Sequence, residues 1–331
     1  MPMYYPKSEV EWLALRHQYV SSTESAPLFG LGSYQTPYEL GLAKQAKDPP
    51  PVLDETERMR WGKRLQEAIA KGISEDYGVR VRRVTGYAVH PECKLGASFD
   101  YEIVGIRKDE AGNEVQVPDM MLQQMYRDLG PGVLEIKNVD GLVFRREWKK
   151  EDGELEAPPQ IEIQVQHQLE AIQTRKWSAI GVLVGGNDAI LVLREYDPEF
   201  GRQIVAKVSK FWADLEQGIL PPVTLPQDVE IIRRIYLAST PGKLYNGNDD
   251  QELAQLCTHY DETAALCKVY EEARKSIGAK ILTKITDAER ATAPGFTISA
   301  TTVAETWVER YLKKSYRLLR ITRLKPKEGA K

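Results

Sequence analysis

The chain has 331 residues, of which 42% are hydrophobic and 28% are charged. Its longest apolar run, around Val182, is too short to span a bilayer, and the first residues lack the pattern of a secretory signal. The three cysteines form no CxxC pair and no cluster with histidine, which argues against a disulfide framework and a structural zinc site. We therefore expect a soluble, cytoplasmic protein without a membrane partner.

The formal net charge is −3 at pH 7, which by itself argues against a nucleic-acid partner, because neutralising phosphates requires lysine and arginine. The charges are unevenly distributed, however. Residues 310–331 are densely basic, whereas residues 249–272 are acidic on balance. A basic tail is usually a solvated surface, so it makes DNA binding only slightly more expected.

Amphipathic patterns predict helices in the first quarter of the chain. The first lies within residues 8–20. A longer one is capped by Asp54 or Thr56 and ends at Gly78. One face of this longer helix is predicted to be apolar and consists of Met59, Leu65, Ile69 and Ile73.

From residue 79 to residue 148 the pattern changes to short runs rich in valine, isoleucine and tyrosine, separated by polar turns. These runs predict strands of a single sheet, interrupted by a helical or irregular insertion at residues 120–130. The predicted strands are residues 79–89, 96–106, 113–118, 132–139 and 141–148. After them we expect a helix at 159–174, a hairpin at 178–196, a helix from about 198 to 217, and a largely helical region beyond residue 226.

A candidate metal site lies in this strand-rich region. Asp100 follows one predicted strand, and Glu135 and Lys137 lie two residues apart on another, so that their side chains share a face. Carboxylates on neighbouring strands are suitable ligands for Mg²⁺ or Mn²⁺, and a lysine beside them is suited to phosphodiester hydrolysis. The Glu-x-Lys pattern alone is short, and by itself it fits a charged structural strand better than a catalytic one.

Five motifs in a fixed order add to this pattern. Together they resemble the viral recombinase group of the PD-(D/E)xK nucleases, represented by the YqaJ family and by lambda exonuclease, over about residues 10 to 200. The motifs are EWLALRHQYVSSTESAPLFGLGSYQTPYEL, RMRWGKRLQEAIA, HPECKLGASFDYEIVG, GVLEIKNV and IEIQVQHQLEAI. The resemblance implies an α/β (α+β) fold with a restriction-endonuclease-like core, a central mixed sheet flanked by helices. This nuclease core would occupy residues 1–225, and residues 226–331 would form an appended helical extension with a basic tail.

The resemblance also assigns the catalytic residues. Asp100 and Glu135 take the places of the family's metal-binding carboxylates, and the backbone carbonyl of Ile136 takes the place of a further ligand. Lys137 corresponds to the catalytic lysine. Gln164 corresponds to the active-site glutamine, an amide that can position water or a phosphate oxygen. The implied cofactor is Mg²⁺ or Mn²⁺.

Further positions correspond to DNA-contacting and water-positioning residues of the family. An arginine and a serine contact the 5′-terminal phosphate there. Arg16 fits the arginine, and Thr23 stands where serine is usual. Tyr34, in the turn that follows, is a candidate to pack against a DNA end. Gln66 stands at the place of a family glutamate with Glu67 immediately after it, which leaves open which of the two positions a metal-bound water.

The implied function is a Mg²⁺-dependent exonuclease that digests linear double-stranded DNA, 5′ to 3′, in phage-type recombination inside a bacterial host. A single-strand annealing protein and a homo-oligomer, in the family a toroidal trimer, are the implied partners. A restriction-like endonuclease is one alternative. Another is a catalytically impaired DNA-binding relative, which the departures at Gln66 and at Tyr101, where the family commonly has glycine, would favour. His167, between two glutamines, is expected to be a packing residue.

Overall fold

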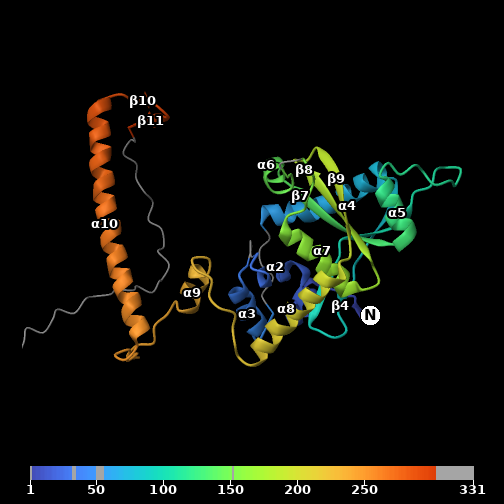
Figure 1. The fold of residues 1–331 in the computed structure, drawn as a ribbon, viewed down its shortest axis with the longest axis horizontal. Coiled ribbons are helices and arrows are strands. Elements are labelled where there is room, and N and C mark those ends of the chain that lie inside the picture. Colours follow the sequence, from blue (N-terminus) through green and yellow to red (C-terminus); the bar gives the residue numbers. More distant parts are fainter. Residues whose placement is uncertain (1, 32–34, 50–55, 151–152, 303–331) are drawn as a thin grey trace, which may run out of the picture. The chain divides into compact units, whose positions relative to one another are not determined.

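The computed structural model describes residues 2–31, 35–49, 56–150 and 153–302 (Figure 1). The chain divides into two compact units, Met1–Ile231 and Ile232–Lys331. The sequence places the boundary after residue 225, whereas the division falls inside helix α9 (Val229–Ile235).

The larger unit is built on a five-stranded mixed sheet with the strand order β3-β6-β7-β8-β9. Neighbouring strands are antiparallel except for β7 and β8, which run parallel because a helical crossover connects them. The strands are β3 (Val79–Arg83), β6 (Tyr101–Ile106), β7 (Gly132–Val139), β8 (Trp177–Val184) and β9 (Asp188–Glu195).

A second sheet, of four short strands, was not predicted. Its order is β1-β4-β5-β2, with β1 (Met3–Tyr4), β4 (Tyr87–Val89), β5 (Leu95–Ser98) and β2 (Val20–Ser21). The prediction of a single sheet is wrong because the chain leaves β3 at Arg83 and resumes as β4, which pairs with β1 and β5. Gly86 permits this close approach, since a Cβ there would lie 2.5 Å from the sulfur of Met3.

Helices cover both faces of the five-stranded sheet and confirm the predicted α/β class. Helix α4 (Glu57–Asp76) begins after the N-cap Thr56, whose side chain accepts a hydrogen bond from the backbone nitrogen of Met59 at 3.2 Å. Its buried residues Ile69 and Ile73 pack against β7 and β8, but Met59 is 55% exposed, so its predicted place on the apolar face is wrong.

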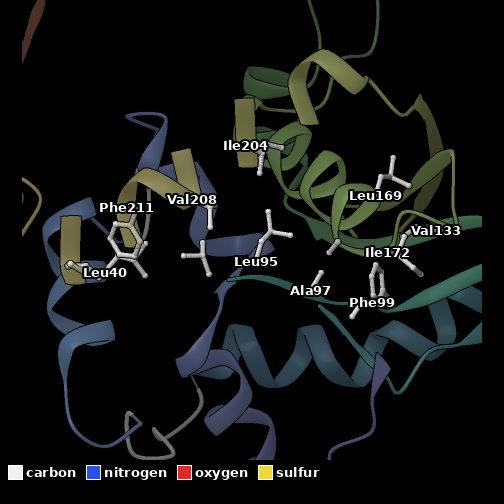
Figure 2. Close-up of a cluster of buried hydrophobic side chains, with 14 residues drawn as sticks. Leu40, Leu95, Ala97, Phe99, Val133, Leu169, Ile172, Ile204, Val208 and Phe211 are labelled. Atoms are coloured by element: carbon white, nitrogen blue, oxygen red, sulfur yellow. The ribbon is translucent and has the colours of Figure 1, made fainter. Parts of the chain in front are cut away.

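Helix α7 (Pro159–Ile172) packs on the opposite face and is buried along ten consecutive residues, from Ile163 to Ile172. Figure 2 shows the core around it, in which α7 and β7 supply one end, β5 supplies the middle, and α8 (Pro198–Glu216) with Leu40 supplies the other end. Each fully buried leucine or isoleucine stabilises such a core by about 1.5–3 kcal/mol. Packing therefore fixes α7, and with it the polar residues that the helix carries.

Two predicted strands are not strands. Most of residues 141–148 form helix α6 (Gly141–Glu147), because the side chain of Asp140 caps it by accepting hydrogen bonds from the backbone nitrogens of Leu142 and Val143. Residues 113–118 form only an isolated bridge between Lys108 and Glu114. The remaining helices of this unit are α1 (Glu9–Gln18), η1 (Ser22–Glu24), α2 (Ser25–Leu28), α3 (Pro37–Gln45) and α5 (Met120–Leu129).

The smaller unit contains the long helix α10 (Gln251–Ile285) and a hairpin of β10 (Arg290–Ala293) and β11 (Phe296–Ser299). The sequence predicts the helix but not the hairpin, whose turn uses Gly295 at a φ of +78°. Within the described part of the chain, no helix is long and apolar enough to cross a membrane.

Candidate active site

Asp100 lies in the short connection between β5 and β6. The antiparallel pairing of Tyr101 with Leu134 brings it next to the Glu-x-Lys segment of β7. Its Oδ2 accepts a hydrogen bond from the backbone nitrogen of Ile136 at 2.9 Å, and its Oδ1 accepts one from Nε2 of Gln66 at 2.8 Å. Residues of α4 and β7 therefore fix the orientation of this carboxyl group.

Glu135 is buried and accepts three hydrogen bonds from side chains. Its Oε1 accepts from Nζ of Lys137 and from Nε2 of Gln164, both at 2.6 Å, and its Oε2 accepts from Nε2 of Gln168 at 2.7 Å. Lys137 also donates to Oε1 of Gln164 at 2.9 Å. Gln164 and Gln168 are four residues apart on α7, so one face of that helix presents both amides to Glu135.

The charge of Glu135 influences the protonation of Asp100. Burial, and next the negative charge of Glu135, raise the pKa of Asp100 to about 7, although the hydrogen bond from Ile136 and the charge of Lys137 oppose this rise. A cation between the carboxylates would remove their repulsion. The electrostatics of the site therefore suit a divalent metal ion.

The donor atoms also suit such an ion. Asp100 and Glu135 offer carboxylate oxygens and Ile136 offers a backbone carbonyl, the hard ligands that Mg²⁺ and Mn²⁺ prefer. Among the described residues, no group of three or more histidine, cysteine, aspartate and glutamate side chains is gathered for a metal. Water would complete the coordination, as is usual for Mg²⁺.

The structure separates Gln66 from Glu67, which the sequence leaves as alternatives. Gln66 points from α4 to Asp100 and donates a hydrogen bond to it. Glu67, the next residue on the helix, is exposed. The amide at position 66 is thus the residue of this pair that belongs to the carboxylate cluster.

His167 is fully buried, and both of its ring nitrogens have partners. Nε2 lies 2.9 Å from the carbonyl oxygen of Gly96, and Nδ1 lies 2.5 Å from Oγ of Ser25. A carbonyl can only accept, so Nε2 carries the proton and Nδ1 accepts from the serine hydroxyl. Burial lowers the pKa of His167 to about 4. The neutral ring joins α7 to β5 and α2, which makes it a packing residue.

A second polar cluster surrounds Arg16 on α1. Its Nη2 donates to Oγ of Ser21 at 2.9 Å and to Oγ1 of Thr23 at 3.3 Å, and it lies 3.5 Å from Oε1 of Glu24. The structure thus brings together Arg16 and Thr23, as the resemblance implies. Tyr34 lies outside the described residues.

Buried Lys44 holds this second cluster in place from α3. Its Nζ donates to Oε2 of Glu24 at 2.8 Å and to the carbonyl oxygens of Arg16 and Tyr19 at 2.6 and 2.9 Å. Although burial opposes ionisation, the positive charges of Lys44 and Arg16 lower the pKa of Glu24. The carboxylate of Glu24 therefore balances the charge of Lys44, and the side chain of Arg16 remains 26% exposed.

The two clusters are linked through direct contacts. The guanidinium of Arg16 lies over the ring of Trp12, 4.7 Å from its centroid, and Nε1 of Trp12 donates to Oγ of Ser98 at 2.8 Å. The carbonyl oxygen of Ser98 accepts from Nε2 of Gln168, which also binds Glu135. Arg16 is therefore connected to Glu135 through Trp12, Ser98 and Gln168.

The sequence analysis does not single out Gln168 in the carboxylate cluster, nor Ser21, Glu24 and Lys44 in the Arg16 cluster. Gln168 follows Gln164 by one helical turn, so the helical period alone was sufficient to find it. Ser21 precedes Thr23 by two residues and contacts the same guanidinium. The resemblance implies only one hydroxyl-bearing residue beside the arginine, which is Thr23 here, and so gives no reason to expect Ser21.

Comparisons with known proteins cover the part of the chain that carries both clusters. Residues 11–174 match the family model of the YqaJ-like viral recombinase domain. The chain is 27% identical over 213 residues to the uncharacterized protein YqaJ of Bacillus subtilis (strain 168), an alignment that spans 64% of this chain and 57% of that protein.

Two solved structures are also similar. Both are of an alkaline exonuclease, LHK-Exo of Laribacter hongkongensis, one of them in complex with dAMP. The complex shows 19% identity and a TM-score of 0.42, and the other structure 18% and 0.41, each covering 68% of this chain and 96% of the exonuclease. The match of residues 11–174 to the YqaJ-like viral recombinase domain confirms the resemblance that the sequence motifs indicate.

Proposed function

We propose that this protein is a metal-dependent DNA exonuclease that hydrolyses phosphodiester bonds of linear double-stranded DNA in phage-type recombination. The observation that carries the proposal is the cluster in which Glu135, Lys137 and Gln164 are hydrogen-bonded to one another and Asp100 binds the backbone of the intervening Ile136. It combines two carboxylates, an ammonium group and an amide, which are the groups that phosphodiester hydrolysis requires.

In this proposal Asp100, Glu135 and the carbonyl of Ile136 hold Mg²⁺ or Mn²⁺. When bound, such an ion would lower the pKa of a water molecule and polarise the phosphate. Lys137, held between Glu135 and Gln164, stabilises the negative charge that develops on the phosphate oxygens. Gln164 orients the attacking water through its amide, and burial of the cluster strengthens each of these interactions.

The Arg16 cluster supports the 5′ to 3′ direction. A guanidinium and the hydroxyls of Ser21 and Thr23 are suited to a terminal phosphate, which accepts charge-assisted hydrogen bonds. Contacts through Trp12 and Ser98 connect the cluster to Gln168. A 5′-phosphate held at Arg16 would therefore set where the strand meets the carboxylates, and Tyr34 would pack against the DNA end.

The partners proposed are a single-strand annealing protein, which coats the strand left behind, and further copies of this chain in a homo-oligomer. Both rest on the family resemblance, in which a toroidal trimer encloses the DNA. Light scattering tests the assembly: a trimer at working concentration is expected, and a monomer would remove the ring from the proposal.

The experiment that tests the activity compares linear duplex DNA with closed circular DNA in the presence of Mg²⁺. We expect loss of the linear species only and no loss of either in EDTA. Cleavage of the circle would instead identify an endonuclease. Binding of linear DNA without metal-dependent cleavage would identify a DNA-binding relative that has lost catalysis.

A further inference from the structure

A basic cavity lies apart from both clusters, where β3 and β6 approach the residues that follow α7. Its volume is about 430 Å³. The lining residues with polar or aromatic side chains are Tyr5, Arg82, Arg83, Thr85, Thr174 and Arg175, together with Glu102. Three guanidinium groups therefore share this cavity with one carboxylate.

The carboxylate does not neutralise the cavity. Glu102 is buried, and its Oε2 lies 2.6 Å from Nη2 of Arg82. Its Oε1 accepts from Arg175 at 3.0 Å through Nε and lies 2.8 Å from Nη2. One negative charge thus orients two positive ones, and the pair of arginines retains a net positive charge.

Arg83 adds a second positive charge. Among the residues that the structure describes, the guanidinium group of Arg83 has no hydrogen-bonding partner and no carboxylate partner, and the side chain is exposed. An arginine in this state offers all five of its N–H donors to a ligand. The wall of the cavity therefore presents two net positive charges with free donors, which suits a phosphate group.

The cavity is also close to the carboxylate cluster. Arg83 pairs with Tyr101, the residue after Asp100, and the backbone nitrogen of Val84 donates to the carbonyl oxygen of Asp100 at 3.1 Å. Glu102 lies on β6, two residues after Asp100, a separation of about 7 Å along extended chain. One DNA strand can thus reach both sites.

We propose that this cavity binds a phosphate of the DNA strand that is cut at Asp100 and Glu135, with a base packed on the exposed ring of Tyr5. The inference rests on the proposed function for the identity of the strand. Arg83 supplies the free charge, Arg82 and Arg175 are positioned by Glu102, and Tyr5 adds a face on which any base can stack. The site thus holds the DNA strand at a second phosphate and keeps the scissile bond next to Asp100 and Glu135.

The test measures binding of a short oligothymidylate, labelled at its 3′ end, by fluorescence anisotropy in EDTA over a series of salt concentrations. Each phosphate contact on a single strand contributes about 0.7 to the slope of log K against log salt concentration. Arg83→Ala is expected to weaken binding and to reduce the slope by about 0.7. Arg83→Lys should keep the slope, because it keeps the charge. Tyr5→Ala should weaken binding without changing the slope.

Arg80→Ala is the matched control, because Arg80 lies on the same strand β3 and is exposed but does not line the cavity. It should bind as the wild type does. An Arg83→Ala slope equal to that of Arg80→Ala would overturn the inference. The readout needs no cleavage, so an Arg83-dependent slope in a protein that fails to cut DNA would retain the cavity site and reject the exonuclease activity.

Discussion

Gln168 donates a hydrogen bond from Nε2 to Oε2 of Glu135 at 2.7 Å, so this carboxylate is held on both of its oxygens. The same amide nitrogen donates to the carbonyl oxygen of Ser98 at 3.1 Å. Gln168 thus connects the position of Glu135 to β5 and, through Trp12, to the Arg16 cluster.

Gln168→Met, which keeps the length of the side chain but removes the donor, is expected to lower the cleavage rate by about 10- to 100-fold, as is typical when a group that orients a metal ligand is removed. The Mg²⁺ concentration for half-maximal rate should rise, because Glu135 is less well oriented. The control is Gln160→Met on the same helix, at a partly exposed position outside the cluster. An unchanged Mg²⁺ requirement in Gln168→Met would show that Gln168 does not position Glu135.

Arg16→Ala is expected to slow digestion of 5′-phosphorylated duplexes by roughly tenfold or more, because it removes a charge-assisted contact to the terminal phosphate. Duplexes with a 5′-hydroxyl should be little affected. Lys44 continues to pair with Glu24 in this variant, so the fold around η1 is retained. The measurement is the rate of digestion of both duplexes by the wild type and by Arg16→Ala. An equal fall in rate on the two duplexes would contradict the assignment of Arg16 to the 5′-phosphate.

The neutral state of His167 predicts a pH dependence of stability. Its pKa is about 4 in the folded protein, below the value of about 6.5 for an unfolded chain. Because the folded pKa is lowered, the stabilisation is complete above pH about 6.5 and is lost as the pH falls towards 4, by up to about 3 kcal/mol.

The measurement is the free energy of unfolding in urea across this pH range for the wild type and His167→Asn. The variant lacks the titrating ring. The difference between the two proteins in the free energy of unfolding should therefore shrink as the pH falls below about 6.5. A constant difference would mean that His167 titrates alike in the folded and unfolded states.

The sequence predicts most of the active site because its residues are close together along the chain or follow a strand period. Glu135 and Lys137 share a strand face whatever their surroundings. The phase of α4 also agrees with the direction in which Gln66 points: it lies three and seven residues before the buried Ile69 and Ile73, which turns it towards the sheet.

Other features depend on contacts that local sequence does not encode. Residues 141–148 contain a short apolar run that fits a strand or a helix equally well. The N-cap hydrogen bonds of Asp140 stabilise the helix. The split into two sheets depends on β1 pairing with β4, across more than eighty residues of sequence. The basic cavity joins Arg82 and Arg83 to Arg175, which only the folded chain brings together.

The central claim is that the cluster of Asp100, Glu135, Lys137 and Gln164 performs metal-dependent cleavage. The most direct measurement is a time course with Mg²⁺ on linear duplex DNA labelled at either end, for the wild type and Lys137→Ala. The account predicts that the wild type releases the 5′ label first, and that Lys137→Ala binds the duplex but cuts it at least about a hundredfold more slowly. Equal cleavage by both proteins would contradict it.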